Sequence, residues 1–177
     1  AFRGASAAET GAVAGMLAPG VGGAAIAAGA AIEQHERAAT DTPAVVRLRQ
    51  PVAGTVVPLS EVPDPMFAQG TMGPGTAIDP TGDTIVAPAD ATVASVFPTG
   101  HAIGLALTDG TELLIHVGID TVDMKGDGFE TLVKAGDIVT AGTPLLRFDA
   151  AKIRAAGHSA VTPIIVLNNE SATVELT

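Results

Sequence analysis

The 177-residue chain contains no Cys, Trp or Tyr and only five Phe. Without cysteine it has no disulfide, no thiolate zinc site, no iron–sulfur ligand and no cysteine nucleophile. Lysine and arginine are also scarce, nine against 19 aspartate and glutamate residues, and the formal net charge is −10. This balance excludes nucleic acid as a partner, because release of counterions from phosphates requires lysine and arginine.

The scarcity of cations is concentrated in the middle of the chain. No Lys or Arg lies between Arg49 and Lys125. Any phosphoryl chemistry in this stretch must therefore take its cationic group from outside the segment. The same stretch holds nine acids, which are Glu61, Asp64, Asp79, Asp83, Asp90, Asp109, Glu112, Asp120 and Asp123.

The first 44 residues are rich in Ala and Gly, and residues 11–32 carry no charge. The length of the uncharged stretch suits a membrane span, which needs about 20 apolar residues. Ala and Gly contribute little transfer energy, however, and the larger apolar side chains are scattered. We therefore expect residues 1–44 to form a flexible tether or interdomain linker, with some helix near residues 24–38. Membrane association is the alternative.

From residue 45 onward, short runs of Val, Ile, Thr and Leu alternate with Gly, Pro and Asp. Runs spaced about 8–12 residues apart indicate an all-β domain, an antiparallel sandwich or barrel, which we place at residues 45–177. Two segments, Phe129–Ala135 and Ala150–Gly157, are expected to be short helices. The expected strands are Val45–Leu48, Gly54–Pro58, Gly75–Pro80, Thr84–Ala87, Ala91–Pro98, Ile103–Thr108, Thr111–Ile119, Pro144–Phe148, Val161–Leu167 and Thr173–Leu176.

The dipeptide Asp109-Gly110 predicts a two-residue hairpin turn, because both central positions of such a turn favour positive φ. This turn would place Ile103 opposite His116, and His101 opposite Gly118. Side chains alternate between the faces of a strand, so the two histidines would share a face as diagonal neighbours whose imidazoles meet. The opposite face would carry the apolar stripe Leu113, Ile115, Val117 and Ile119.

Two converging imidazoles have three interpretations. They are structural histidines satisfied by their neighbours, or metal ligands that need Asp120 or Asp64 to join them, or a phosphohistidine relay. In a relay, a neutral ring nitrogen attacks a phosphoryl group and the second imidazole stabilises the new charge. The acidic surroundings are expected to raise the pKa of a histidine, so a hydrogen bond must fix the tautomer of the nucleophile. A backbone carbonyl near Gly118 or the Thr99 hydroxyl would serve.

The run LLIHVGIDTV, residues 113–122, resembles the active-site strand of the glucose-type IIA proteins of the bacterial phosphoenolpyruvate-dependent sugar phosphotransferase system. A second histidine, His101, lies fifteen residues before His116, as the family pattern requires. The resemblance implies an antiparallel β-sandwich of the duplicated hybrid-motif kind. It extends from Pro51 to Thr177 and includes residues 51–56, 62–68, 73–78, 80–82, 86–88, 101–102, 125–129 and 162–165.

This resemblance implies a role for each matching residue. His116 corresponds to the histidine that accepts the phosphoryl group on Nε2, and His101 to the imidazole that stabilises the phosphorylated state. Thr99 corresponds to the threonine that orients the second ring, the Gly118 carbonyl holds the first ring, and Asp120 lies beside the site. An apolar rim for docking partners would comprise Met66, Phe67, Met72, Phe97 and Val122, each of which has a core position as its alternative.

The resemblance also implies the partners, and it implies neither a metal nor a cofactor. The donor would be the phosphocarrier protein HPr, whose histidine lies near an arginine that supplies the missing cation. The acceptor would be a cysteine of a IIB domain, on another protein or another part of a longer chain, because this chain has no Cys. The expected location is the cytoplasm, beside a permease domain in the membrane.

Two other functions are alternatives. Residues 133–145 resemble half of a biotinyl or lipoyl carrier domain, in which Lys125 after Met124 would carry the cofactor, although Gly126 follows where a second methionine is usual. A purely regulatory binding protein is the other, because members of the IIA family also bind transporters and enzymes when unphosphorylated. A zinc peptidase is disfavoured, since the spacing of His35 and His158 suits surface histidines rather than metal ligands.

Overall fold

A computed structural model describes residues 43–177, so most of the predicted tether, its predicted helix and His35 lie outside the described residues. The domain boundary at residue 45 therefore stays a prediction. The strands are β1 (Ala44–Leu48), β2 (Gly54–Val57), β3 (Gly75–Pro80), β4 (Thr84–Val86), β5 (Ala91–Val96), β6 (Ala102–Leu107), β7 (Glu112–His116), β8 (Phe129–Thr131), β9 (Ile138–Val139), β10 (Pro144–Phe148), β11 (Thr162–Val166) and β12 (Ala172–Leu176). The helices are α2 (Pro65–Ala68), α3 (Ala150–Ala155) and the 3₁₀ turns η1 (Leu59–Glu61) and η2 (Thr121–Met124).

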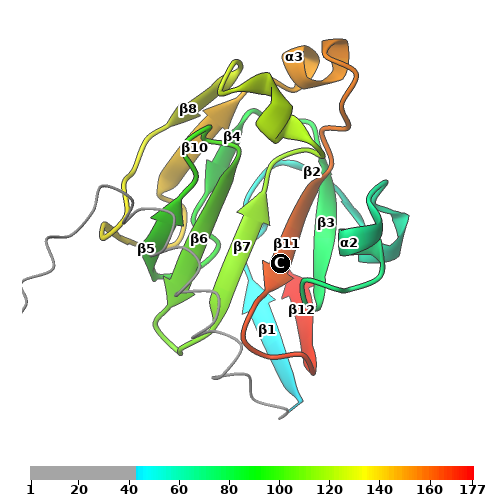
Figure 1. Cartoon of the computed structure of the whole chain (residues 1–177). Helices are drawn as coiled ribbons and strands as arrows, with labels where there is room; N and C mark the ends of the chain where they lie inside the picture. Colours follow the sequence, from blue (N-terminus) through cyan, green and yellow to red (C-terminus); the bar gives the residue numbers. More distant parts are fainter. Residues whose placement is uncertain (1–42) are drawn as a thin grey trace, which may run out of the picture.

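The strands form three sheets. The largest has seven strands in the order β2-β3-β11-β7-β6-β5-β9, and a three-stranded sheet has the order β4-β10-β8. All of these pairings are antiparallel, which confirms the predicted all-β, antiparallel class. The exception is the pair β1 and β12, which is parallel and joins the beginning of the described chain to its end (Figure 1).

The expected strands are all present, two of them with the predicted bounds, and α3 confirms one of the two expected helices. The other is wrong: residues 129–131 form strand β8, where Phe129 lies opposite Phe148 of β10. Pairing with a neighbouring strand decided this segment, not local propensity. The expected strand Thr111–Ile119 ends early at His116, because Gly118 turns the chain with a φ of 74°.

The turn between β6 and β7 differs from the predicted one. The N–H of Leu107 donates to the carbonyl of Thr111 at 2.8 Å, which leaves three residues in the loop. Only Gly110 has a positive φ there, 92°. Asp109 instead uses its side chain, whose Oδ1 accepts from the Thr111 N–H at 2.8 Å. This arrangement is the common three-residue hairpin, in which a left-handed residue follows an ordinary turn.

The longer turn makes the predicted register wrong by one residue. His116 lies opposite Ala102, and Ile103 lies opposite Ile115. A slip of one residue exchanges the two faces of a strand. Ile103 and Leu105 therefore face the main core together with Leu113 and Ile115 of β7, and do not share a face with His116. Ile119, the last residue of the predicted apolar stripe, lies beyond β7 and belongs to a second apolar cluster.

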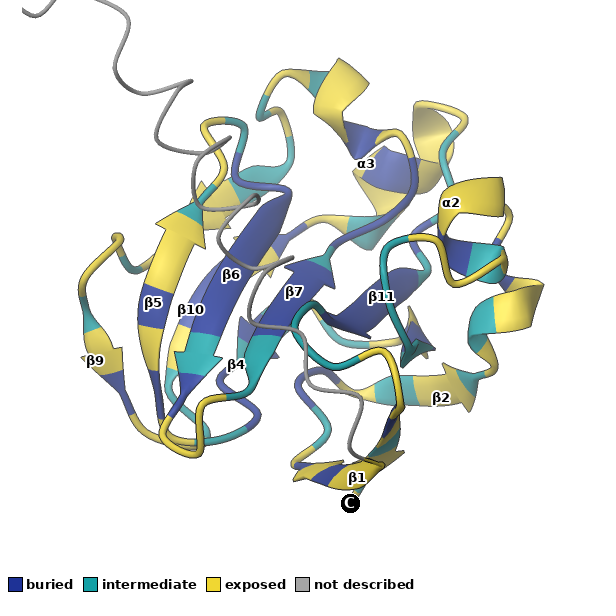
Figure 2. Ribbon diagram, turned by 60° about the horizontal axis from the view of Figure 1, so that its bottom comes forward, coloured by how far each residue is buried: buried dark blue, intermediate teal, exposed yellow. Residues whose placement is uncertain are grey.

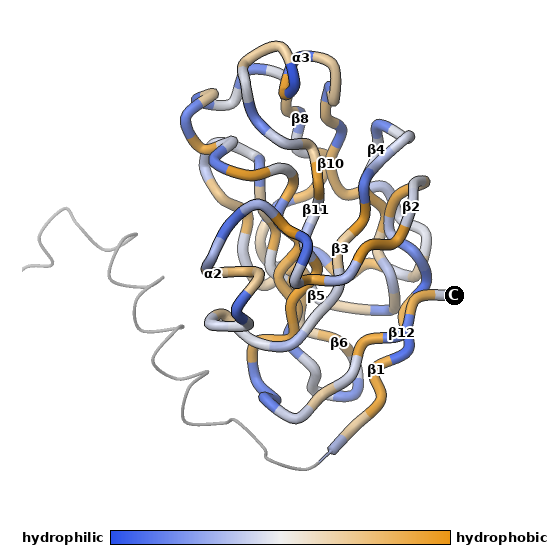
Figure 3. Tube along the Cα trace, turned by 90° about the vertical axis from the view of Figure 1, so that its right-hand side faces the viewer, coloured by the Kyte–Doolittle hydropathy of each residue, from blue (hydrophilic) through white to orange (hydrophobic). Residues whose placement is uncertain are grey.

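Apolar side chains are buried on both faces of the large sheet. The main cluster includes Ile103, Ile115 and Ile164, while their strand neighbours Leu114 and Ile165 belong to a second cluster beneath α2. Figure 2 shows the buried residues concentrated in β6, β7 and β11, and Figure 3 shows hydrophobic stretches along the strands. Each fully buried Leu or Ile contributes about 1.5–3 kcal/mol. β7, which ends at His116, and β6, which begins after His101, are thus anchored in the core.

Candidate functional site

The two histidines meet at one end of the paired strands β6 and β7. His116 is the last residue of β7, and His101 directly precedes β6. Their ring centroids lie 4.9 Å apart with planes at 73°. The backbone joins the two segments, because the N–H of Val117 donates to the His101 carbonyl at 2.7 Å. The predicted meeting of the imidazoles is confirmed, although the predicted register is wrong.

Irregular backbone beyond the strand ends explains how this happens. Gly100 has a φ of 69° and Gly118 a φ of 74°, and both glycines adjoin the histidine segments. The chain leaves regular strand geometry there, so strict alternation of faces no longer determines where His101 points. Gly118 itself has no room for a side chain. A Cβ on Gly118 would lie 2.8 Å from the Ser159 carbonyl oxygen and 2.5 Å from Cγ2 of Thr121.

The Gly118 carbonyl fixes the protonation of the His116 ring. Nδ1 of His116 lies 2.7 Å from this oxygen. A carbonyl oxygen only accepts hydrogen bonds, so Nδ1 carries the proton and the neutral ring keeps its lone pair on Nε2. His116 thus has a free ring nitrogen of the kind that attacks an electrophile.

A hydroxyl group holds the other ring. Oγ1 of Thr99 forms a hydrogen bond with Nδ1 of His101. A hydroxyl both donates and accepts, so Thr99 permits either neutral tautomer of His101. His101 is only 5% exposed, and the Phe97 ring packs against it with centroids 5.6 Å apart. When Thr99 donates to Nδ1, Nε2 of His101 carries a proton that it can offer to a neighbouring negative charge.

Burial dominates the electrostatics of both rings. Desolvation and, to a smaller extent, the neighbouring His116 together lower the pKa of His101 from 6.5 to about 4. Desolvation also lowers the pKa of His116, against the opposing effects of the Gly118 carbonyl, Asp64 and Asp120. The expectation that the acidic surroundings raise these pKa values is wrong, because the loss of water outweighs them. Both rings are neutral at pH 7.

The two acids near His116 have structural positions of their own. Asp64 begins α2, where its Oδ1 accepts from the N–H of Met66 at 2.7 Å. Asp120 precedes η2 with a φ of 57° and is exposed. Within residues 43–177, no group of three or more His, Asp or Glu side chains is arranged to hold a metal ion. The metal interpretation therefore lacks a third ligand among these residues.

The predicted apolar rim divides into two groups. Met66, Phe97 and Val122 are 53%, 40% and 51% exposed, and thus have side chains free to contact a partner. Phe67 is buried, and its ring packs against His116 with centroids 5.3 Å apart. Met72 is half-buried against the cluster beneath α2. Phe67 and Met72 thus occupy the core positions that were the alternative, with Phe67 forming a wall of the site.

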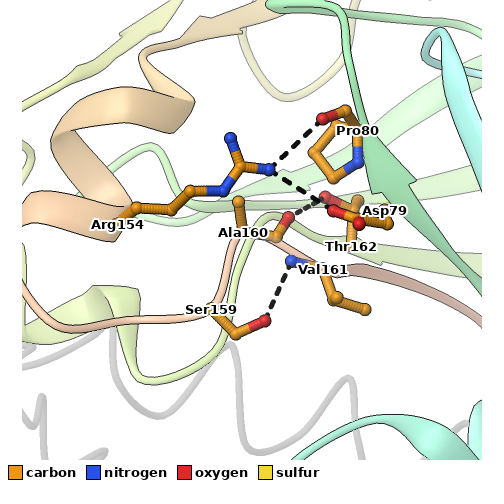
Figure 4. Close-up of polar contacts among 7 residues, drawn as sticks. All are labelled: Asp79, Pro80, Arg154, Ser159, Ala160, Val161 and Thr162. Atoms are coloured by element: carbon orange, nitrogen blue, oxygen red, sulfur yellow. Dashed lines mark hydrogen bonds and ion pairs between the residues drawn. The ribbon is translucent and has the colours of Figure 1, made fainter.

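Sequence reasoning missed the segment that lies behind Gly118. The Ser159 carbonyl accepts from the N–H of Ile119 at 2.9 Å, and buried Thr121 donates to the Val117 carbonyl at 2.6 Å. Figure 4 shows the segment 159–162 beside Arg154, whose Nη2 lies 3.4 Å from Oδ1 of Asp79. Nothing in the sequence indicates which backbone carbonyl will accept a hydrogen bond. Thr121 differs from Thr99 in being fully buried, and this is visible only in the structure.

The biotinyl or lipoyl alternative requires its lysine at the tip of a β-hairpin. Lys125 is exposed, but it lies at the end of η2 with a φ of 54° rather than between two paired strands. The structure therefore gives this alternative no support.

Within residues 43–177, no helix has the length and hydrophobicity needed to cross a membrane.

Comparison with known proteins identifies relatives of this arrangement. Residues 46–172 match the family described as "phosphoenolpyruvate-dependent sugar phosphotransferase system, EIIA 1". The glucose-specific EIIBCA component of Corynebacterium glutamicum is 52% identical over 124 residues, which cover 70% of this chain and 18% of that protein. The glucose-specific EIIA component of Staphylococcus epidermidis is 44% identical over 125 residues, covering 71% of this chain and 75% of the relative.

A solved structure matches as well. The glucose permease IIA of Mycoplasma capricolum superimposes with a TM-score of 0.66 at 38% identity, covering 69% of this chain and 79% of that one. The chain therefore spans 75–79% of these EIIA relatives but only 18% of the EIIBCA relatives, of which the mannose-specific component of Corynebacterium glutamicum, 52% identical, is a second example.

Proposed function

This chain belongs to the EIIA 1 family of the phosphoenolpyruvate-dependent sugar phosphotransferase system, and we propose that it carries a phosphoryl group on Nε2 of His116. One observation carries the proposal: the hydrogen bond between Nδ1 and the Gly118 carbonyl, 2.7 Å long, leaves the lone pair on Nε2. Burial supports the same role, since it lowers the pKa of His116 and keeps the nucleophile unprotonated.

The transfer exchanges one bond to phosphorus for another. The Nε2 lone pair attacks phosphorus, a P–N bond forms at His116, and the P–N bond to the donor's histidine breaks with its electron pair returning to the donor ring. The Gly118 carbonyl stabilises the positive charge that develops on the His116 ring. His101 stabilises the phosphoryl oxygens by donating from Nε2 while Thr99 occupies its Nδ1. Asp120 is the acid beside this site.

The donor we propose is phosphorylated HPr. The segment between Arg49 and Lys125, which contains both histidines, has no Lys or Arg. An arginine beside the donor's histidine would supply the charge that phosphoryl transfer needs, and the acids Asp64 and Asp120 would attract it. The exposed side chains of Met66, Phe97 and Val122 are suited to form the apolar centre of this contact, with Phe67 and Met72 supporting them from below.

The acceptor we propose is a cysteine of a IIB domain, and the transported sugar a hexose. This chain has no Cys, so the acceptor lies outside the printed sequence. The names of the relatives support both parts, since two relatives are EIIBCA components and the names specify glucose or mannose. In the onward step the thiolate of that cysteine attacks phosphorus, a P–S bond forms, the P–N bond at His116 breaks, and Nε2 regains its lone pair.

Phosphoryl labelling tests the assignment. The chain is incubated with radiolabelled phosphoenolpyruvate, Enzyme I and HPr, and the expected product is a label that is stable in alkali and labile in acid, as a phosphoramidate is. His116→Ala should abolish the label, while the matched variant His158→Ala, at a half-exposed position outside the site, should keep it. Circular dichroism confirms that both variants fold. A label that survives in folded His116→Ala would place the nucleophile elsewhere.

A further inference from the structure

A row of hydrogen bonds continues beyond the Gly118 carbonyl, away from His116. The Gly118 carbonyl and the Ile119 N–H belong to one peptide group. Its oxygen accepts from Nδ1 of His116 at 2.7 Å, and its N–H donates to the Ser159 carbonyl at 2.9 Å. In a trans peptide these two groups point in opposite directions. The Ser159 contact therefore fixes the direction of the oxygen that faces His116, and bonds in such a row polarise one another.

Thr121 fixes the peptide group next to this one. Its side chain is fully buried, and its Oγ1 donates to the Val117 carbonyl at 2.6 Å. The Val117 N–H donates to the His101 carbonyl at 2.7 Å. The backbone N–H and carbonyl of Val117 are thus both hydrogen-bonded, the first to His101 and the second to Thr121. The carbonyls of both residues between His116 and Ile119 are therefore held by hydrogen bonds from side chains.

The Ser159 carbonyl is itself held by a local turn, which Figure 4 shows. Oγ of Ser159 accepts from the Val161 N–H at 3.2 Å. The buried Thr162 donates from Oγ1 to the Ala160 carbonyl at 3.1 Å. The turn precedes β11, which is buried along its whole length. The far end of the row of hydrogen bonds is therefore anchored to the core.

We propose that Thr121 and the turn at Ser159 are positioning elements for phosphoryl transfer, which hold the Gly118 carbonyl where it keeps the proton of His116 on Nδ1 and Nε2 free to react. This inference rests on the proposed function of His116. Thr121 hydrogen-bonds neither reacting nitrogen, so it acts through the backbone. A threonine that only filled space would be replaceable by valine, which has the same branched shape and no hydroxyl.

The test compares Thr121→Val with Thr121→Ser in the full chain. Valine keeps both branches and removes the donor, whereas serine keeps the donor and removes the Cγ2 methyl. NMR of ¹⁵N-histidine reports which nitrogen of His116 carries the proton and the pKa of the ring. Acceptance of phosphate from phosphorylated HPr gives kcat and KM. Ser159→Ala, at a half-exposed position, repeats the test from the other end of the row.

We expect Thr121→Val to move the His116 proton from Nδ1 toward Nε2 and to lower kcat about tenfold with KM unchanged. A tenfold loss corresponds to the free energy of one ordinary hydrogen bond. Thr121→Ser should restore the wild-type tautomer and rate. Ser159→Ala should change both in the direction of Thr121→Val, by about threefold.

The pKa of His116 separates positioning from simple loosening. The charged or titratable groups that act on this ring are His101, Asp64 and Asp120, and none of them is altered. Burial lowers this pKa and the Gly118 carbonyl raises it, so a displaced carbonyl should lower the pKa further. A loop that opened to water would instead move the pKa up toward 6.5, its value in water.

Three results would overturn the inference: an unchanged tautomer in Thr121→Val, a pKa that rises, or a rate in Thr121→Ser that falls as far as in Thr121→Val. If Thr121→Val does not fold, Ser159→Ala decides, and an unchanged tautomer there rejects the inference. The NMR measurement needs no phosphorylation. A wild-type chain that takes no label while Thr121→Val shifts the proton would therefore reject the proposed function and keep the positioning role.

Discussion

His101 and His116 lie side by side, yet different groups hold their rings. Nδ1 of His116 meets the Gly118 carbonyl, which can only accept a hydrogen bond. Nδ1 of His101 meets the Thr99 hydroxyl, which can donate or accept. The carbonyl allows a single neutral tautomer, as a nucleophile requires. The hydroxyl allows two, as suits a ring that faces a lone pair before transfer and phosphoryl oxygens after it.

The charged groups that act on the pKa of the two rings differ as well. Asp64 and Asp120 oppose the effect of burial at His116, whereas at His101 burial and the neighbouring His116 act in the same direction and lower the pKa to about 4. A phosphoryl group on His116 would reverse this for His101, because a nearby negative charge raises the pKa of an imidazole. In the function that we propose, His116 receives the phosphoryl group and His101 responds to it.

The largest expected effect divides the two histidines by the direction of transfer. In His101→Gln, acceptance from phosphorylated HPr should fall only a few-fold, because His116 keeps its Nδ1 contact. Onward transfer to a IIB cysteine should fall about 100- to 1,000-fold, the usual cost of one lost donor at a developing charge. Quench-flow with radiolabelled phosphate measures both steps.

His101→Asn is the matched control, since its shorter side chain retains an amide but places it elsewhere. If His101→Gln slowed acceptance and onward transfer equally, the two rings would have one shared role. The comparison would then fail, while the assignment of His116 would stand.

A second prediction concerns the glycine that carries the His116 contact. A Cβ on Gly118 would meet the Ser159 carbonyl at 2.8 Å, whereas a Cβ on Gly110 meets nothing within 4 Å. Both residues have a positive φ, 74° and 92°. Gly118→Ala should therefore lower acceptance about 100-fold by displacing the carbonyl. Gly110→Ala should cost only the strain of its backbone, about 1 kcal/mol in urea unfolding, with normal acceptance.

Comparing Gly118→Ala with Gly110→Ala separates displacement of the carbonyl from backbone strain. Both variants have the strain, but only Gly118→Ala displaces the carbonyl. Normal acceptance in a folded Gly118→Ala would mean that the carbonyl does not set the tautomer. Our account of His116 would then lose its basis, while the account of Thr99 and His101 would not.

Much of this fold is visible in the sequence, for a physical reason. Val, Ile and Thr in short runs between Gly, Pro and Asp carry local information on strands, and every expected strand is present. The helix expected at residues 129–135 is wrong because β8 depends on pairing with β10, more than ten residues away. Contacts over such distances leave no mark on local periodicity.

The site was predictable in part, and for the same reason. The sequence indicates which imidazoles meet, but the register of their strands depends on the side chain of Asp109, which completes a three-residue loop. The sign of the pKa shifts was not predictable, since it depends on burial outweighing Asp64 and Asp120. Backbone partners such as the Ser159 carbonyl carry no sequence signal, because every residue has a carbonyl.

A third prediction compares two threonines, one on each side of the site. Thr99 holds His101 and Thr121 acts on the His116 side. Thr99→Val should slow onward transfer about tenfold and leave acceptance nearly unchanged. Thr121→Val should do the opposite. Thr99→Ser, which keeps the hydroxyl, is the control and should behave as wild type. If the two valine variants slowed acceptance and onward transfer equally, the two rings would not have separate roles in the two steps.

The smallest expected effect is in the pH dependence. Because burial lowers the pKa of both histidines, acceptance measured with saturating donor should stay flat as pH falls from 8 to 6.5. NMR titration should place the midpoint of His101 near 4 and that of His116 below 6.5. A midpoint near 6.5 for either ring would show that burial does not outweigh the neighbouring acids.

Stability should report the same shifts with a definite sign. Below pH 6.5 the histidines of the unfolded chain bind protons that the folded chain refuses, so the free energy of unfolding should fall as pH falls. For His101 this decline should continue to about pH 4, where the folded ring also titrates. Urea unfolding at pH 7 and 5.5 measures the loss before most carboxylates titrate. In His101→Gln the loss should shrink, because glutamine does not titrate, and the lowered pKa of His116 accounts for what remains. An undiminished loss in that variant would mean that His101 titrates alike in both states, and thus that burial does not lower its pKa.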